Sequence, residues 1–179
     1  RYVIYNPEQQ PLKNPYAFGN AWFVDKLDMV DNADAEIEAL NTIDPLRTAV
    51  VDKRFQEDLE GFVPQKDSTA TIVLEEYRPN RLTYKSKADK EQLAVFSEVY
   101  YQPGWKATVD GKEVPHFRAD WILRGMRVPA GEHTIVFEFR PSGYVTAAYV
   151  SSYSSFLILL LLIAAIGWSG WKYWKKSKN

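Results

Sequence analysis

The sequence contains no cysteine and only two histidines, His116 and His133, among its 179 residues. A disulfide framework, a thiolate metal site and a cysteine nucleophile are therefore excluded, as is a metal centre built from several histidines. The chain has no P-loop, GxGxxG, GxSxG or HExxH motif, so the enzyme classes that these short motifs identify are not indicated. We expect no metal, no cofactor and no catalytic residue here. Each histidine could act as an acid-base group, but surface or edge positions in β-loops are the favoured interpretation.

Acidic and basic residues are nearly balanced, 23 against 22, but their distribution is uneven. Four lysines lie in the last eight residues, which contain no acid: Lys172, Lys175, Lys176 and Lys178. Residues 1–171 therefore carry 18 bases and 23 acids. An acidic body with a basic tail is not typical of nucleic-acid-binding proteins, so we expect no nucleic-acid partner.

A long uncharged segment precedes the basic tail. No charged residue occurs in the 31 positions between Arg140 and Lys172, and ten consecutive apolar residues run from Phe156 to Ala165. A helix of about 20 residues crosses the hydrocarbon core of a bilayer, and aromatic residues gather at membrane interfaces, as they do here between positions 168 and 174. The alternative, a helix buried in a soluble domain, would need protein on every side. We therefore predict a transmembrane helix over residues 153–174.

The lysines that follow this helix predict its orientation. By the positive-inside rule they place the C-terminus in the cytoplasm, and the residues before about 144 outside the cytoplasmic membrane. The predicted organisation is an extracytoplasmic β-rich domain over 1–143, a juxtamembrane segment over 144–152, the transmembrane helix over 153–174 and a cytoplasmic basic tail over 175–179. Because the chain starts at Arg1 without a secretion signal, we expect a C-terminal piece of a multi-pass protein with further spans upstream.

The body of the chain shows the two-residue period of β-strands. TATIVLEEY, RLTYKSKA, EQLAVFSEVYY and HTIVFEFR alternate apolar and polar residues, which predicts half-buried strands. Asp110-Gly111 predicts a tight hairpin, because a type I′ turn needs positive φ at both positions. One helix is predicted over residues 31–43, capped by Asp31 or Asn32. Turns about every ten residues favour a mainly β fold: an antiparallel β-sandwich or jelly-roll-like ectodomain with one or two short helices, followed by a single C-terminal transmembrane helix.

Residues 117–131 contain candidate binding groups. Arginines and Asp120 surround Trp121 and could form a polar patch for a sugar hydroxyl, a lipid phosphate or a neighbouring loop. In the competing structural interpretation, Arg118 and Asp120 share a strand face and pair locally while Trp121 packs. Trp105, just after a Pro-Gly turn, could stack on a sugar or close the end of a sandwich. The candidate glycan-binding residues are Trp105, Asp120, Trp121 and Arg124.

Several blocks of the sequence resemble the C-terminal region of the YfhO family of bacterial membrane proteins. These blocks are NPYAFGNAWFV, DNADAEIEAL, VVDKRF and YYQPGWKATVDGKEVPHFRADWILRGMRVPAGEHTIVFEFRP, the last followed closely by the membrane helix. The resemblance covers nearly the whole chain. It implies a large polytopic protein related to GT-C-type glycosyltransferases, which use polyprenyl-phosphate-linked sugars outside the cytoplasm. It also places the catalytic acids in an early external loop between transmembrane helices, so no catalytic residue is carried over.

Together these features predict the extracytoplasmic C-terminal domain of a polytopic protein involved in cell-envelope glycan glycosylation, where it supports acceptor binding or packs over the membrane core. The expected partners are the lipid bilayer, the upstream transmembrane region and, through the resemblance, a polyprenyl-phosphate sugar and an envelope glycan. Two alternatives stay open. One is a purely structural or carbohydrate-binding ectodomain without catalytic activity, and the other is a component of a transporter or flippase.

Overall fold

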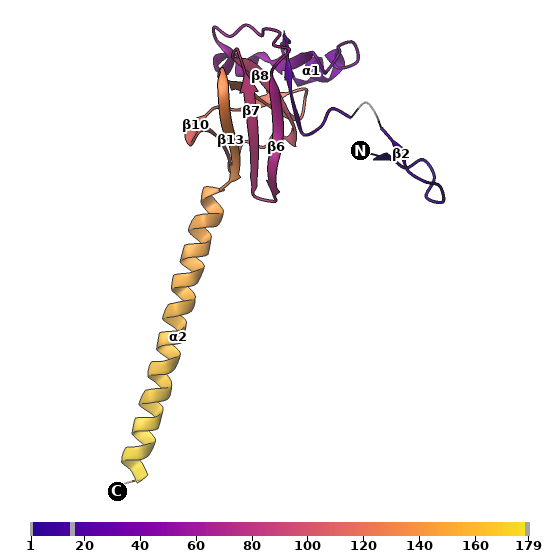
Figure 1. The fold of residues 1–179 in the computed structure, drawn as a ribbon. Helices are drawn as coiled ribbons and strands as arrows, with labels where there is room; N and C mark the ends of the chain where they lie inside the picture. The colour runs from indigo at the N-terminus through magenta and orange to yellow at the C-terminus, as the bar shows by residue number, and fades with distance from the viewer. Residues whose placement is uncertain (1, 15–16, 178–179) are drawn as a thin grey trace. The chain divides into compact units, whose positions relative to one another are not determined.

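The computed structural model describes residues 2–14 and 17–177 (Figure 1). The chain divides into two compact units, Arg1–Phe139 and Arg140–Asn179. Positions 15–16 in the first block of the family resemblance and positions 178–179 of the predicted tail lie outside the described residues.

The first unit contains thirteen strands, one α-helix and one 3-10 helix within its described residues. The strands are β1 (Tyr2–Val3), β2 (Leu12–Lys13), β3 (Ala21–Val24), β4 (Lys26–Val30), β5 (Thr48–Asp52), β6 (Thr71–Arg78), β7 (Arg81–Ala88), β8 (Gln92–Val99), β9 (Trp105–Val109), β10 (Lys112–Val114), β11 (Phe117–Ala119), β12 (Leu123–Val128) and β13 (Gly131–Phe139). The helices are α1 (Ala33–Ala39) and the 3-10 helix η1 (Lys53–Leu59).

Two antiparallel sheets form the body of this unit, with strand orders β10-β9-β13-β7-β6 and β11-β12-β8-β3. Figure 1 shows β13, β7 and β6 side by side in the five-stranded sheet. Tyr84 of β7 and Phe137 of β13 pack against Phe96 of β8, with ring centroids 4.9 Å from Phe96 in both cases. Since these rings belong to one core between the sheets, the prediction of a mainly β, antiparallel sandwich is confirmed.

The turns of the sandwich follow the predicted chemistry. Asp110 and Gly111 join β9 to β10 with φ angles of 50° and 81°. Positive φ at both positions is what a type I′ hairpin requires. This hairpin brings the end of β10 back beside β9, so it sets the position of the residues that follow β10.

A third layer covers the outer face of the four-stranded sheet. β4 and β5 pair in parallel, and α1 lies between them in the chain, as a crossover between parallel strands requires. Val51 of β5 and Leu59 of η1 share a core cluster with Leu93 and Val95 of β8. Gln92–Phe96 are consequently all buried, so the prediction of a half-buried strand was wrong here. β8 is covered on both of its faces.

The helix α1 begins where predicted and ends earlier. The Asn32 side chain accepts a hydrogen bond from the backbone N–H of Ala35 at 2.9 Å, which caps the helix. After Ala39 the backbone N–H groups of Asn41 and Thr42 donate to carbonyls three residues back. These tighter turns replace the α-helical pattern, so residues 40–43 are not helical.

The second unit is one continuous helix, α2 (Ser142–Ser177). Residues Thr146–Lys175 have the length and apolar composition needed to cross a membrane. The predicted C-terminal apolar helix is therefore confirmed, and the predicted juxtamembrane residues 144–152 form part of the same helix.

Candidate functional site

The candidate site is a groove between η1 and the end of β10. Two adjoining hollows, of about 390 and 230 Å³, share Asp58, Val114 and Pro115 in their walls. The larger hollow is lined by aromatic and polar side chains, including Phe55, Asp58, Tyr100, Gln102, Trp105 and His116. We call the two hollows together the aromatic groove. Because the hollows adjoin, they offer neighbouring contact surfaces to one ligand.

The 3-10 helix η1 supplies one wall of the groove. The Asp52 carboxylate caps it by accepting a hydrogen bond from the backbone N–H of Arg54 at 2.9 Å. Residues three apart in a 3-10 helix lie on the same side, so Phe55 and Asp58 both face the groove. The Phe55 ring meets Tyr100 edge to face at 5.8 Å.

Aromatic rings continue along the opposite wall. Tyr100 also meets His116 edge to face, with ring centroids 5.6 Å apart. Trp105 is the first residue of β9, where it pairs with Phe139 of β13, and the two rings lie 5.3 Å apart. Trp105 is only half-buried, so part of its ring is available to a ligand.

Arg124 supports Trp105 from the interior of the sandwich. Its guanidinium lies 4.1 Å from the centre of the Trp105 ring and 5.2 Å from that of Phe137. Its Nε donates to the carbonyl of Val99 at 3.0 Å, and its Nη1 is buried without a partner among the described residues. The structure therefore brings together two of the four predicted site residues, Trp105 and Arg124. Arg124 acts as a support beneath the ring.

Most charges along the aromatic groove are already paired. Lys106 pairs with Glu113 at 3.1 Å, and Arg127 pairs with Glu91 at 2.9 Å. Asp58 differs, because it makes no hydrogen bond or ion pair within the described part of the chain and faces both hollows. Burial raises the pKa of the Asp58 carboxyl above its usual value, and neighbouring Glu57 adds to this effect. Asp58 can therefore accept hydrogen bonds from a ligand.

The two histidines lie in different environments. His116 is half-buried and its Nε2 atom is buried without a partner in the described structure. Burial, with a smaller contribution from Arg124, lowers the pKa of His116 to about 4, so its ring is neutral at pH 7. The His133 Nδ1 lies 2.6 Å from Asp110 Oδ2, and Nε2 lies 3.0 Å from the Ala130 carbonyl oxygen. These contacts raise the pKa of His133 and fasten two turns together.

The other two predicted residues, Asp120 and Trp121, lie in the turn between β11 and β12 and do not line the aromatic groove. Asp120 is buried, and its Oδ1 accepts a hydrogen bond from the Val50 backbone at 2.8 Å. The expected local pair between Arg118 and Asp120 is wrong. Arg118 donates instead to the buried carboxylate of Glu36 at 2.6 Å, which lies 82 positions away in the sequence.

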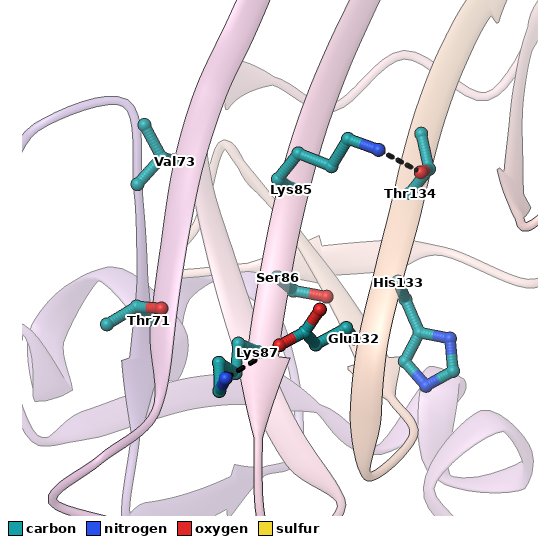
Figure 2. A pocket seen from close by; sticks show the side chains of 8 residues that line it. All are labelled: Thr71, Val73, Lys85, Ser86, Lys87, Glu132, His133 and Thr134. Atoms are coloured by element: carbon teal, nitrogen blue, oxygen red, sulfur yellow. Dashed lines mark hydrogen bonds and ion pairs between the residues drawn. The ribbon is translucent and has the colours of Figure 1, made fainter.

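A larger hollow of about 520 Å³ lies on the outer face of the five-stranded sheet. Figure 2 shows that its polar groups pair with one another across strands: Lys85 donates to Thr134 at 2.8 Å, and Lys87 donates to Glu132 at 2.6 Å. Among the described residues that line it, the imidazole of His133 is the one aromatic ring. Although this hollow is larger, its charged side chains are already paired with one another and leave few groups to bind a ligand. We therefore place the candidate site in the aromatic groove.

Sequence reasoning identified Trp105 and missed the wall opposite it. Asp58 lies in KRFQEDLEG, which carries no recognisable binding motif. The only signal is its spacing from Phe55 in η1, and that spacing becomes informative once η1 is known to be a 3-10 helix packed beside β10. Phe55 and Tyr100 likewise gain their role from a contact across 45 positions of sequence.

Comparison with known proteins places most of the chain around the aromatic groove in a family. The family described as bacterial membrane protein YfhO matches residues 56–151, which is more than half of the chain. This region begins within η1, directly after Phe55, includes the strands β6 to β13 and ends within α2. No curated protein and no solved structure matched the chain. The family match agrees with the apolar helix and the β-rich unit, and the chain belongs to the YfhO family of bacterial membrane proteins.

Proposed function

We propose that this β-domain binds and orients a glycan acceptor chain for a membrane-embedded glycosylation reaction of the cell envelope. In this proposal the sugar donor is polyprenyl-phosphate-linked, and the catalytic acids lie in another part of the polytopic protein. The aromatic groove would hold a segment of the acceptor. The residues before about 144 would face the outside of the cytoplasmic membrane.

The observation that carries this proposal is the combination of half-buried aromatic rings and an unpaired carboxylate in one groove. The apolar faces of sugars stack on aromatic side chains, which contribute a large contact area with little conformational freedom to lose. Phe55, Tyr100 and Trp105 supply such rings. Asp58 and Gln102 supply polar groups beside them, and a carboxylate can accept two sugar hydroxyls at once.

The charge state of the groove favours a ligand rich in hydroxyl groups. Two basic side chains lie nearest the rings, and both are paired: Lys106 with Glu113, and Arg54 with Asp52. His116 adds no positive charge at pH 7, since burial lowers its pKa to about 4. With Asp58 as the unpaired charge, the groove is better suited to hydroxyls, which donate hydrogen bonds, than to a phosphate.

The test is titration of the chain, held in lipid nanodiscs, with linear oligosaccharides of increasing length. We expect binding to be measurable by tryptophan fluorescence or calorimetry and to strengthen with length, because the two hollows adjoin. Asp58→Asn should weaken binding at least about tenfold, since a hydrogen bond to a charged group contributes about 1.5–3 kcal/mol. The substitution keeps the size of the side chain.

The matched control is Glu57→Gln. Glu57 is exposed on the same helix and does not line the groove, so this variant should bind like the wild type. Equal affinity of wild type, Asp58→Asn and Tyr100→Phe for every oligosaccharide, with all three folded, would contradict acceptor binding and favour a purely structural domain.

A further inference from the structure

The turn between β11 and β12 has a strained backbone. Asp120 and Trp121 have φ angles of 49° and 70°, in the left-handed region that residues other than glycine seldom occupy. The backbone N–H of Ile122 donates to the Asp120 carbonyl at 2.8 Å. A three-residue turn with positive φ at its centre is a rare and strained γ-turn. Strain of this kind persists only where the surroundings fix it.

Two buried carboxylates fix this turn. Asp120 exchanges two hydrogen bonds with Val50, one through its side chain and one through its backbone N–H, each 2.8 Å long. The fully buried Glu36 accepts a hydrogen bond from the backbone N–H of Trp121 at 3.0 Å. The same Glu36 carboxylate also pairs with Arg118. Residues of α1, β5 and β11 therefore hold the turn in its strained form.

The strained turn displays apolar side chains. Trp121 and Ile122 keep exposed fractions of 42% and 43%. Val99 and Tyr101 lie beside them with exposed fractions of 62% and 53%, because Val99 pairs with Leu123 and the Tyr100 N–H donates to the Ile122 carbonyl at 2.7 Å. We call Val99, Tyr101, Trp121 and Ile122 the apolar rim. The strained turn costs free energy, and the exposed apolar side chains that it presents do not offset this cost by burial in the fold. Exposed apolar residues that lie together are typical of interaction surfaces. The apolar rim therefore fits an interaction surface.

The covalent chain keeps this rim near a membrane. The rim lies at the end of the sandwich where β13 finishes, because Phe139 pairs with Trp105 and Arg124, two positions after Ile122, stacks on Trp105. Six residues separate Phe139 from Thr146, where the candidate span begins. Such a link reaches at most about 25 Å. This limit holds for any orientation of the two units.

We propose that the apolar rim inserts into the interfacial layer of the lipid bilayer. Tryptophan and tyrosine prefer this layer, where a ring can bury its apolar body and keep its polar tip wet. Ile122 and Val99 add apolar area without charge. The rim and the aromatic groove use different residues, so this proposal does not depend on glycan binding.

The absence of cysteine from the chain permits a direct test. Ile122→Cys is labelled with the environment-sensitive fluorophore NBD, and the full chain is reconstituted in phosphatidylcholine nanodiscs with lipid that carries a spin label near the headgroup. Lys112→Cys, just after the distant β9–β10 turn, is the matched control. We expect a blue-shifted emission and several-fold stronger quenching at position 122 than at position 112.

Proximity through the covalent link alone could also quench the probe at position 122. Adding Trp121→Ser and Tyr101→Ser to the Ile122→Cys variant separates the two causes. Loss of most of the quenching supports insertion of the rim. Unchanged quenching in this triple variant, or equal quenching at positions 122 and 112 in the parents, overturns the proposal.

Discussion

At the scale of single residues, Gly125 lies where the structure leaves no room for a side chain. It lies opposite Phe117 in the pairing of β12 with β11. A Cβ atom at Gly125 would lie 2.4 Å from Cε2 of the Phe117 ring. Phe117 is 1% exposed and packs in the second core cluster, so its ring has little room to move. Gly125→Ala should lower the free energy of unfolding by about 1–3 kcal/mol, as overpacking does, measured by denaturant titration.

A double variant checks the cause of this loss. Phe117→Leu removes the ring that the new methyl group meets. Its effect combined with Gly125→Ala should therefore be smaller than the sum of the two single effects, because the residues are in contact. Additive effects would show that the glycine is required for a reason other than its distance from the Phe117 ring.

The sequence was least informative about contacts between residues that lie far apart in the chain. The predicted pair of Arg118 and Asp120 rested on their two-residue spacing. Both side chains instead reach partners in the third layer, Glu36 and Val50. A strand pattern tells which residues share a face, but it does not tell what packs on that face. The same limit explains why the sequence offered Trp105 as a candidate residue and gave no indication of Asp58, which lines the same groove.

At the scale of elements, Asp120 couples the β11–β12 turn to β5. Burial raises the pKa of Asp120 to about 6, and the charge of Glu36 adds to the shift. The pKa is higher in the folded state than its ordinary value of 3.8. The stability from this group is therefore fully present below about pH 4 and is lost as the pH rises through about 6. The loss is on the order of 3 kcal/mol, from about 1.4 kcal/mol per pKa unit.

Asp120→Asn should remove this pH dependence, because an amide keeps the acceptor for the Val50 N–H and does not titrate. The free energy of unfolding of the variant, relative to the wild type, should therefore rise between pH 4 and pH 7. Asp110→Asn is a control for which we expect a pH dependence of the opposite sign. His133 holds the pKa of Asp110 below its usual value, so that carboxylate stabilises the fold above its unfolded pKa and loses this effect as the pH falls. Parallel pH profiles for wild type and Asp120→Asn would contradict the coupling.

Element types were predictable from the sequence, and their surroundings were not. The hairpin at Asp110-Gly111 and the cap at Asn32 formed as expected, because turn and capping chemistry is local. β8 was expected to have one solvated face, yet Ala94 and Phe96 are buried in the sandwich while Leu93 and Val95 are buried under the third layer. Continuous apolar sequence from Leu93 to Phe96 was the available signal, and it indicates burial on both faces.

At the scale of the whole molecule, the two units differ in whether they bury or expose their apolar side chains. The β-domain buries its apolar residues in two clusters. The helix α2 exposes nearly every described side chain, including the apolar run from Phe156 to Ile163. Because a bare apolar helix of this length is costly in water, the membrane is the environment that makes the whole chain stable. We propose that its lysine-rich end sets which side of the membrane the β-domain faces.

The proposed orientation places the β-domain outside and the lysine-rich end in the cytoplasm, since lysines near the end of a span are retained on the cytoplasmic side. Single cysteines at Lys112 and at Ser177 can report this in cells that carry the protein in its native membrane, because the chain supplies no cysteine of its own. A membrane-impermeant maleimide should label Lys112→Cys in intact cells and Ser177→Cys only after permeabilisation. Replacing Lys172 and Lys175 with glutamate should weaken this preference, whereas replacing Lys85 and Lys87 should not. Labelling of Ser177→Cys in intact cells, with Lys112→Cys protected, would reverse the orientation and remove the proposed access of the aromatic groove to envelope glycans.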